Sequence, residues 1–140
     1  MSDSHSHYLI VGGSAAGMAA AQAIREKDPR GAVTVLSEEA DAPYFRPLIP
    51  FLVSGRKAPG EMALAGNGPY TGADITVRTG ARVAAVAPED HRVVLADGAT
   101  HGYDKVLFAT GSRPYVPPGI EGTAAEGVYA LRTLADARRM

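Results

Sequence analysis

The chain has 140 residues, of which 46% are hydrophobic and 21% are charged, and its formal net charge is -1. These proportions are typical of a globular domain, and the nearly neutral charge argues against a nucleic-acid partner or an anionic membrane surface. The absence of cysteine excludes disulfides, thiolate metal sites and redox-active cysteine pairs within these residues. No apolar run approaches the roughly 20 residues of a membrane-spanning helix, so we expect a soluble, cytoplasmic protein.

The N-terminal part of the chain predicts a parallel βαβ unit. Residues 8–11 form a short β-favouring run that ends in the sequence Gly-Gly-Ser-Ala-Ala-Gly, and residues 32–36 form a second run. Between them, Ala15 to Lys27 are good helix formers, and Pro29 disfavours helical geometry at the residue before it. Two strands joined by a helix through short connections predict a right-handed parallel crossover. Residues 1–7 are polar and are expected to be a disordered tail.

The middle of the chain predicts a proline-rich loop followed by several short strands. Residues 41–60 contain four prolines, so only a helical turn near residues 49–54 is expected there. Turn sequences around Asp90 and Asp97 separate later apolar runs at hairpin spacing. We expect an antiparallel meander inserted into the parallel sheet. The runs expected to be strands are 75–77, 82–87, 92–96 and 106–109, with a further short one at 128–131.

The glycine-rich turn carries the first chemical signal. In a dinucleotide-binding βαβ unit the first glycine, here Gly12, permits a tight turn, and the last, here Gly17, allows the helix to pack closely. The helix N-terminus then offers free N–H groups to a pyrophosphate. Ser14 stands at the middle position, where the fingerprint has glycine, and adds a side chain near the phosphates. A turn of this kind without a ligand is the alternative interpretation.

Two acidic residues after the second strand extend this pattern. Glu38 and Glu39 lie about 20 residues after Gly17, where a dinucleotide-binding fold places an acid on the ribose hydroxyls. We favour Glu38 over Glu39 for this role. Two solvated glutamates are the alternative, and a plain NAD-binding Rossmann domain would carry the same two signals.

A second motif lies in residues 103–114, a buried strand that ends in Ala109-Thr110-Gly111. Together with the glycine turn and the meander, it resembles the flavoprotein pyridine nucleotide-disulfide oxidoreductase superfamily, in which the stretch through an Ala-Thr-Gly triplet is a flavin-domain signature. The segment Pro43-Tyr44-Phe45-Arg46-Pro47-Leu48 is similar to the Pro-Tyr-x-Arg-Pro segment of ferredoxin and rubredoxin reductases and of the flavin-binding part of nitrite reductases. The resemblance covers nearly all of residues 8 to 136.

The sequence departs from the family pattern in two respects. Pro50 and Phe51 stand where a Ser-Lys pair commonly follows the Arg-Pro segment. The opening glycine turn is closer to that of coenzyme A disulfide reductases, but those carry a catalytic cysteine in the loop after the second strand, and this chain has none. We therefore expect a member without the redox cysteine and without coenzyme A disulfide reductase activity.

The resemblance implies FAD as the cofactor. Arg46 and Pro47 are expected along the flavin, since a guanidinium can donate charge-assisted hydrogen bonds to a pyrophosphate or to the ring edge. An exposed loop arginine is the alternative for Arg46. Val83 matches the family position whose backbone pairs with the adenine edge, and no catalytic or metal-binding residue is expected. The candidate cofactor-binding residues are Gly12, Gly13, Ser14, Ala16, Gly17, Glu38, Glu39, Arg46, Pro47, Val83, Ala109, Thr110 and Gly111.

The resemblance also implies an incomplete domain. Residues 8–126 match the N-terminal part of an FAD-binding domain, and residues 127–140 look like the crossover toward an NAD(P)-binding domain. In that crossover, Thr133 and Asp136 have the spacing of a helix capping box. We expect the whole enzyme to pass electrons from NAD(P)H through FAD to an electron-carrier protein or a small-molecule acceptor.

By themselves, these 140 residues are expected to bind FAD weakly, through its ADP portion, and to lack NAD(P)H-dependent turnover. An unpaired sheet edge favours strand pairing between copies, so we expect a homo-oligomer. A catalytically inactive nucleotide-binding module is the alternative function.

Overall fold

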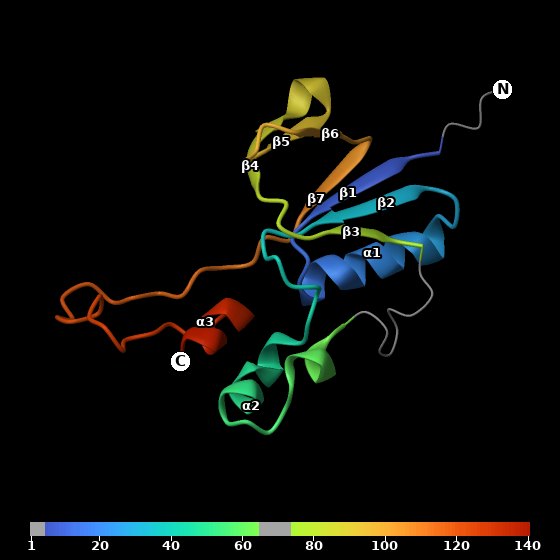
Figure 1. Cartoon of the computed structure of the whole chain (residues 1–140). Helices are drawn as coiled ribbons and strands as arrows, with labels where there is room; N and C mark the ends of the chain where they lie inside the picture. The colour runs from blue at the N-terminus through green and yellow to red at the C-terminus, as the bar shows by residue number, and fades with distance from the viewer. Residues whose placement is uncertain (1–4, 65–73) are drawn as a thin grey trace.

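The computed structural model describes residues 5–64 and 74–140. Four strands form a parallel sheet in the order β3-β2-β1-β7, and helix α1 (Ala15–Lys27) connects β1 to β2 (Figure 1). The α/β class with a Rossmann-like parallel sheet, predicted from the sequence, is confirmed. The strands are β1 (His7–Val11), β2 (Ala32–Leu36), β3 (Thr76–Arg78) and β7 (Lys105–Phe108).

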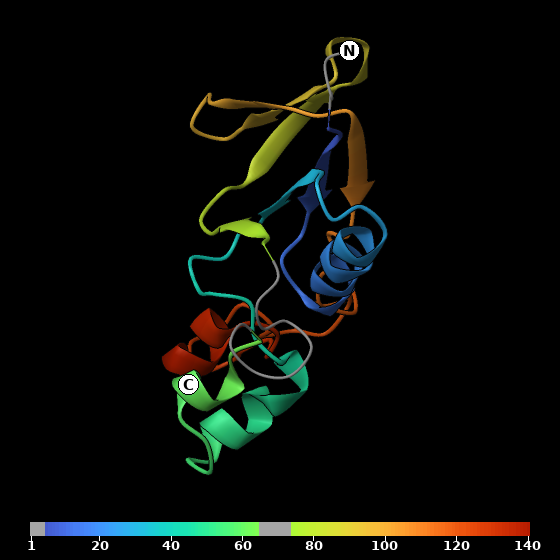
Figure 2. The same cartoon turned by 90° about the vertical axis from the view of Figure 1, so that its right-hand side faces the viewer.

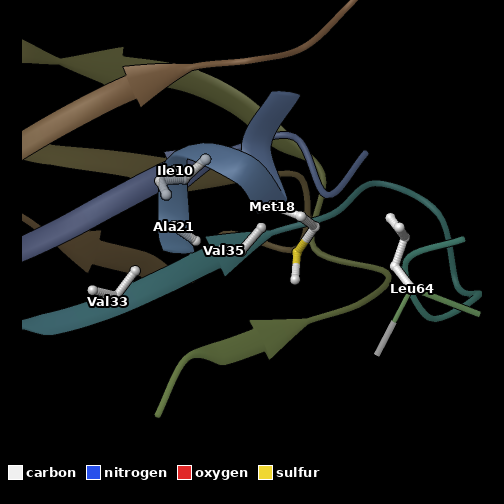
Figure 3. Close-up of a cluster of buried hydrophobic side chains, with 6 residues drawn as sticks. All are labelled: Ile10, Met18, Ala21, Val33, Val35 and Leu64. Carbon is white, nitrogen blue, oxygen red and sulfur yellow. The ribbon is translucent and has the colours of Figure 1, made fainter. Parts of the chain in front are cut away.

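A buried apolar cluster holds α1 against one face of this sheet. Met18 and Ala21 lie on the same side of the helix because residues three apart are neighbours on a helix surface. β1 is hydrogen-bonded on both sides, and Ile10 is fully buried, which explains why this strand is a continuous apolar run. The packing brings the N-terminus of α1 to the edge where β1 ends. The cluster consists of Ile10, Met18, Ala21, Val33, Val35 and Leu64 (Figure 3).

A separate antiparallel sheet packs on the other face. It has the order β4-β5-β6 and lies beside the parallel sheet (Figure 2). Val93 and Leu95 of β5 form a buried cluster with Leu9 and Leu36 of the parallel sheet. The expected meander therefore exists as its own sheet, while β3 and β7 belong to the parallel one. β6 was not expected, because a run of three residues without apolar alternation carries no strand signal. The strands are β4 (Val83–Ala87), β5 (Arg92–Leu95) and β6 (Thr100–Gly102), and a 3-10 turn at Pro88–Asp90 joins the first two.

Short helical elements form a third group, which lies together in both views (Figures 1 and 2). It comprises α2 (Ile49–Val53), α3 (Leu134–Arg139) and 3-10 turns at Arg46–Leu48 and Pro59–Met62, packed around a small apolar cluster that includes Leu134. The helical turn expected within the proline-rich stretch, near residues 49–54, and the expected capping box are both confirmed. In the capping box, the Asp136 amide donates to the Thr133 hydroxyl at 3.1 Å, and the Thr133 amide donates to the Asp136 carboxylate at 2.8 Å.

Two expectations need correction. Residues 109–133 contain turns but neither helix nor strand, so the strand expected at 128–131 is wrong; within the described residues, no strand pairs with this segment (Figure 1). His7, expected in a disordered tail, is the first residue of β1, and its amide donates to Asp104. Residues 1–4 of that tail lie outside the described residues. None of the helices in the described part has the length and apolarity that crossing a membrane requires.

Candidate functional site

Two glycines allow α1 to begin directly at the ends of β1 and β7. Gly12 follows β1 with a φ of +120°, and a Cβ at this position would overlap the carbonyl oxygen of Ala109. A Cβ at Gly17 would in turn overlap the carbonyl oxygen of Gly12. Glycine is therefore required at both positions, for the turn at the first and for close helix packing at the second.

The N-terminus of α1 lies beside the end of β2. Ser14 precedes the helix, and the first helical hydrogen bond ends on its carbonyl oxygen at 2.9 Å. The amides of residues 15–17 are those that a helix leaves without an intrahelical acceptor, and Ala16 is exposed there. A Cβ at Gly13 would stand 2.8 Å from the Cβ of Ser37, so the turn also runs close to β2. These amides and the positive end of the helix dipole suit a phosphate group.

The two acids after β2 have different surroundings. Glu38 is exposed, and its carboxylate lies 3.7 Å from the guanidinium of Arg82. Glu39 is more enclosed: it forms an ion pair with Arg46 and accepts a hydrogen bond of 2.6 Å from the hydroxyl of Tyr44. Glu39 is thus engaged within the protein, while the interaction of Glu38 within residues 5–64 and 74–140 is a loose surface ion pair.

Arg46 joins the proline-rich loop to the glycine turn. Its Nε donates to the Ser14 hydroxyl at 3.0 Å, and its Nη1 donates to the backbone carbonyl of Arg132 at 2.9 Å. Its Nη2 is bonded to Glu39, and only 25% of the side chain is exposed. The alternative of a freely exposed loop arginine is therefore wrong. The guanidinium connects three segments that are distant in sequence.

Tyr44 forms the second centre of this network. The residue is buried, and its hydroxyl donates to Glu39 and accepts from the Leu134 amide at 3.0 Å. Burial, and after it the hydrogen bond to Glu39, raises the pKa of Tyr44 to about 12. The hydroxyl is therefore protonated across the physiological range, as its role as donor to a carboxylate requires.

The Ala-Thr-Gly triplet lies beside the glycine turn, since a Cβ on Gly12 would overlap the carbonyl oxygen of Ala109. The Ala109 amide donates to the Val11 carbonyl at 2.8 Å, which continues the pairing of β7 with β1. Thr110 is exposed. Gly111 has a φ of +72°, and a Cβ on Gly111 would lie 2.9 Å from the guanidinium of Arg132.

Val83 belongs to the antiparallel sheet, unlike the glycine turn and the strands beside it. It begins β4 and packs beside the cluster of Leu9 and Leu36. Two residues earlier, the Ala81 amide donates to the Ser37 carbonyl at 2.8 Å, so the segment leading to Val83 passes the end of β2. The structure therefore gathers the glycine turn, both acids, Arg46 and the triplet, with Val83 at their border.

An open cavity of about 490 Å³ borders this group, a size that suits a small molecule. Three arginines line it, Arg46, Arg113 and Arg132. Its apolar lining comes from the side chains of Pro47, Ile49, Pro50, Pro114 and Leu131. The cavity thus combines apolar surface with positive charge.

Tyr44, Arg113 and Arg132 were not among the candidates from the sequence. Tyr44 belongs to the Pro-Tyr-x-Arg-Pro segment, so the motif pointed to it without giving it a role. Arg113 directly follows the strand motif, and Arg132 lies in the stretch expected to be a crossover. Arg113 and Arg132 line the same cavity as Arg46 because of the path that residues 109–133 take in the folded chain. Local sequence patterns do not encode that path.

Comparison with known proteins agrees with these features. The family model described as pyridine nucleotide-disulphide oxidoreductase matches residues 6–140. The chain is 36% identical over 136 residues to the NADH-dependent phenylglyoxylate dehydrogenase subunit epsilon of Aromatoleum evansii. This alignment covers 97% of the present chain and 32% of that protein. It is 34% identical over 135 residues to the 3-phenylpropionate/cinnamic acid dioxygenase ferredoxin–NAD(+) reductase component of Photorhabdus laumondii subsp. laumondii. This second alignment covers 95% of the present chain and 34% of that protein.

The fold is also similar to a solved structure. A chain in the crystal structure of the covalent putidaredoxin reductase–putidaredoxin complex superposes with a TM-score of 0.80 at 26% identity, over 98% of this chain and 34% of that chain. The present chain spans about a third of the length of the curated relatives that it matches.

Proposed function

The chain belongs to the pyridine nucleotide-disulphide oxidoreductase family, and we propose from this premise that it forms the FAD-binding part of an NAD(P)H-dependent flavoprotein oxidoreductase. Members of this family bind FAD and use NAD(P)H. One observation carries the proposal for these residues: Arg46 contacts Ser14 of the glycine turn and also lines the cavity. A helix N-terminus that suits a pyrophosphate is therefore adjacent to a cavity that suits a ring system.

The ADP half of the cofactor fits the edge where β1 and β2 end. The amides at the start of α1, with Gly12, Gly13 and Ser14, would hold the pyrophosphate. Glu38 would accept hydrogen bonds from the ribose hydroxyls, since Glu39 already accepts from Tyr44 and Arg46. The Val83 backbone would pair with the adenine edge, and the Ala-Thr-Gly triplet would flank the pyrophosphate.

The flavin half fits the cavity. Pro47 and Pro50 offer flat apolar surface, while Arg113 and Arg132 offer donors to ring carbonyls or phosphate oxygens. When bound, FAD would supply the electron transfer between NAD(P)H and an acceptor. Because the chain contains no cysteine, its own residues offer no thiol for exchange with a disulfide substrate.

For the whole protein, an electron-carrier protein is the acceptor that we favour over a small molecule. The support is that one curated relative is named a ferredoxin–NAD(+) reductase component and that the similar structure is a complex of putidaredoxin reductase with putidaredoxin. We further propose a cytoplasmic location.

The open edge of the parallel sheet supports self-association of this chain. Among the described residues, β7 pairs with β1 alone, and Leu107 and Phe108 on it are exposed. An edge strand presents unpaired amides and carbonyls that another strand can bind. A homo-oligomer of these 140 residues that pairs through β7 is the expected result.

Titration of the purified chain with FAD, ADP and NAD+ tests the proposed function. We expect FAD and ADP to bind and to compete with each other, and we expect NAD+ to bind more weakly than either. Preference for NAD+ would instead support a plain NAD-binding Rossmann domain, and binding of none of the three would contradict the proposal. A dye-reduction assay with NADH then separates an enzyme from a nucleotide-binding module without turnover.

A further inference from the structure

The hydroxyl of Tyr44 joins three segments of the chain at one point. It donates to Glu39 at 2.6 Å, and it accepts from the Leu134 amide at 3.0 Å and from Nη1 of Arg46 at 3.3 Å. A phenol has one donor hydrogen and two acceptor lone pairs, so these three bonds use its full capacity. Because the side chain is buried, water cannot replace a bond that is lost.

The same network fixes the orientation of Arg46. The guanidinium is held at Nε by Ser14, at Nη1 by Tyr44 and the Arg132 carbonyl, and at Nη2 by Glu39. It also lies over the Tyr44 ring, 5.4 Å from the ring centroid. A planar fork held on all its nitrogens cannot turn freely, so its direction relative to the glycine turn is set by its neighbours.

We propose that Tyr44 and Glu39 are positioning residues that hold Arg46 against the glycine turn. A diphosphate bound at the turn and the hydrogen bond from the Leu134 amide to Tyr44, which holds the start of α3, then stabilise each other. This inference rests on the proposed function, because it takes the turn as the diphosphate site. Tyr44 touches no part of that site itself and acts through Arg46 and the Leu134 amide. Coupling of this kind is reciprocal: a diphosphate that favours this orientation of Arg46 also favours the contacts of residues 132–134, and weaker contacts there lower the affinity for the diphosphate.

The first test uses Tyr44→Phe, which keeps the ring and removes only the hydroxyl. ADP is the probe, and its Kd is measured by calorimetry on the folded chain, with amide hydrogen exchange recorded with and without ADP. We expect the Kd for ADP to rise about 3- to 10-fold in Tyr44→Phe, the range for one lost hydrogen bond. We also expect saturating ADP to slow exchange of the Leu134 amide in the wild-type chain and to have no such effect in the variant. Tyr115→Phe, at a tyrosine that is 80% exposed, is the matched control and should bind ADP as the wild type does.

A second variant keeps the test decisive if Tyr44→Phe does not fold. Arg46→Lys retains the charge but loses the planar fork, so positioning predicts a similar rise in the Kd for ADP, whereas a requirement for charge alone predicts a wild-type Kd. Wild-type affinity in Tyr44→Phe, or in Arg46→Lys, would overturn the inference and leave the proposed function standing. Absence of ADP and FAD binding by the wild-type chain would overturn both.

Discussion

A Cβ on residue 17 would overlap the carbonyl oxygen of Gly12, so the helix can approach the end of β1 only because Gly17 has no side chain. The atom in the way is backbone, which cannot rotate aside as a flexible side chain could. We therefore expect Gly17→Ala to destabilise the chain by about 1 to 3 kcal/mol, as overpacking does, and to abolish FAD binding by displacing the turn. Thermal melting and an FAD titration measure the two effects.

The control for this prediction is Gly60→Ala. Gly60 lies in a 3-10 turn, and a Cβ there would meet nothing within 4 Å. This variant should melt at or slightly above the wild-type temperature, because it mainly reduces the freedom of the unfolded chain. Equal losses of stability in both alanine variants would contradict the role given to the contact with Gly12.

Replacing the two acids after β2 should have different consequences. Glu38→Ala removes the acid proposed for the ribose and should weaken ADP binding by about 1.5 to 3 kcal/mol, the range for hydrogen bonds to a charged group. Its effect on the melting temperature should be small, because its ion pair with Arg82 is on the surface. Glu39→Ala should lower the melting temperature, since it removes the acceptor of the Tyr44 hydroxyl and the ion-pair partner of Arg46. A larger loss of stability in Glu38→Ala would show that the two roles are exchanged.

Much of the parallel unit could be predicted because its signals are local. The bounds of α1 follow from the glycine turn at one end and from Pro29 at the other. β6 was missed because Thr100–Gly102 is short and lacks an apolar pattern. Residues 128–131 have strand-like composition, but a strand also needs a hydrogen-bonding neighbour, and composition does not supply one.

The candidate site also contains residues whose role could be predicted from the local sequence and residues whose role could not. Gly12 and Gly17 were predicted because their role depends on the turn that contains them. The role of Tyr44 was not predicted, because its hydroxyl accepts a hydrogen bond from the amide of Leu134, which lies 90 residues further along the chain. The sequence motif indicated that Arg46 is important, but its enclosure by Glu39, Ser14 and Arg132 arises only in the folded chain.

The raised pKa of Tyr44 predicts a specific loss of stability in alkali. Its ordinary value is 10.0 and its folded value is about 12, so folding favours the protonated form. This contribution is fully present below pH 10 and is lost as the pH rises through about 12. A pKa difference of this size corresponds to roughly 3 kcal/mol. Denaturant unfolding across this pH range should show a steeper decline for the wild type than for Tyr44→Phe. Parallel declines would contradict the assignment.

The open edge of β7 predicts self-association that one charged residue weakens. Light scattering should find the wild-type chain as a dimer or a larger assembly. Leu107→Lys places a charge on the edge strand, where Leu107 is 42% exposed, and should shift the chain toward the monomer. Val53→Lys, at a similarly exposed apolar residue on α2, should leave the assembly unchanged. A monodisperse wild-type monomer would contradict the edge argument.

The most direct test of the account is a map of backbone amide shifts by NMR as FAD is added to the chain. If FAD binds as proposed, the amides of residues 12–17 and of Thr110 and Gly111 should shift together, and ADP alone should reproduce the shifts at the glycine turn. The amide of Arg113, a residue that lines the cavity, should respond to FAD but not to ADP. Saturable FAD binding that leaves residues 12–17 unshifted would contradict binding of the FAD diphosphate at the glycine turn.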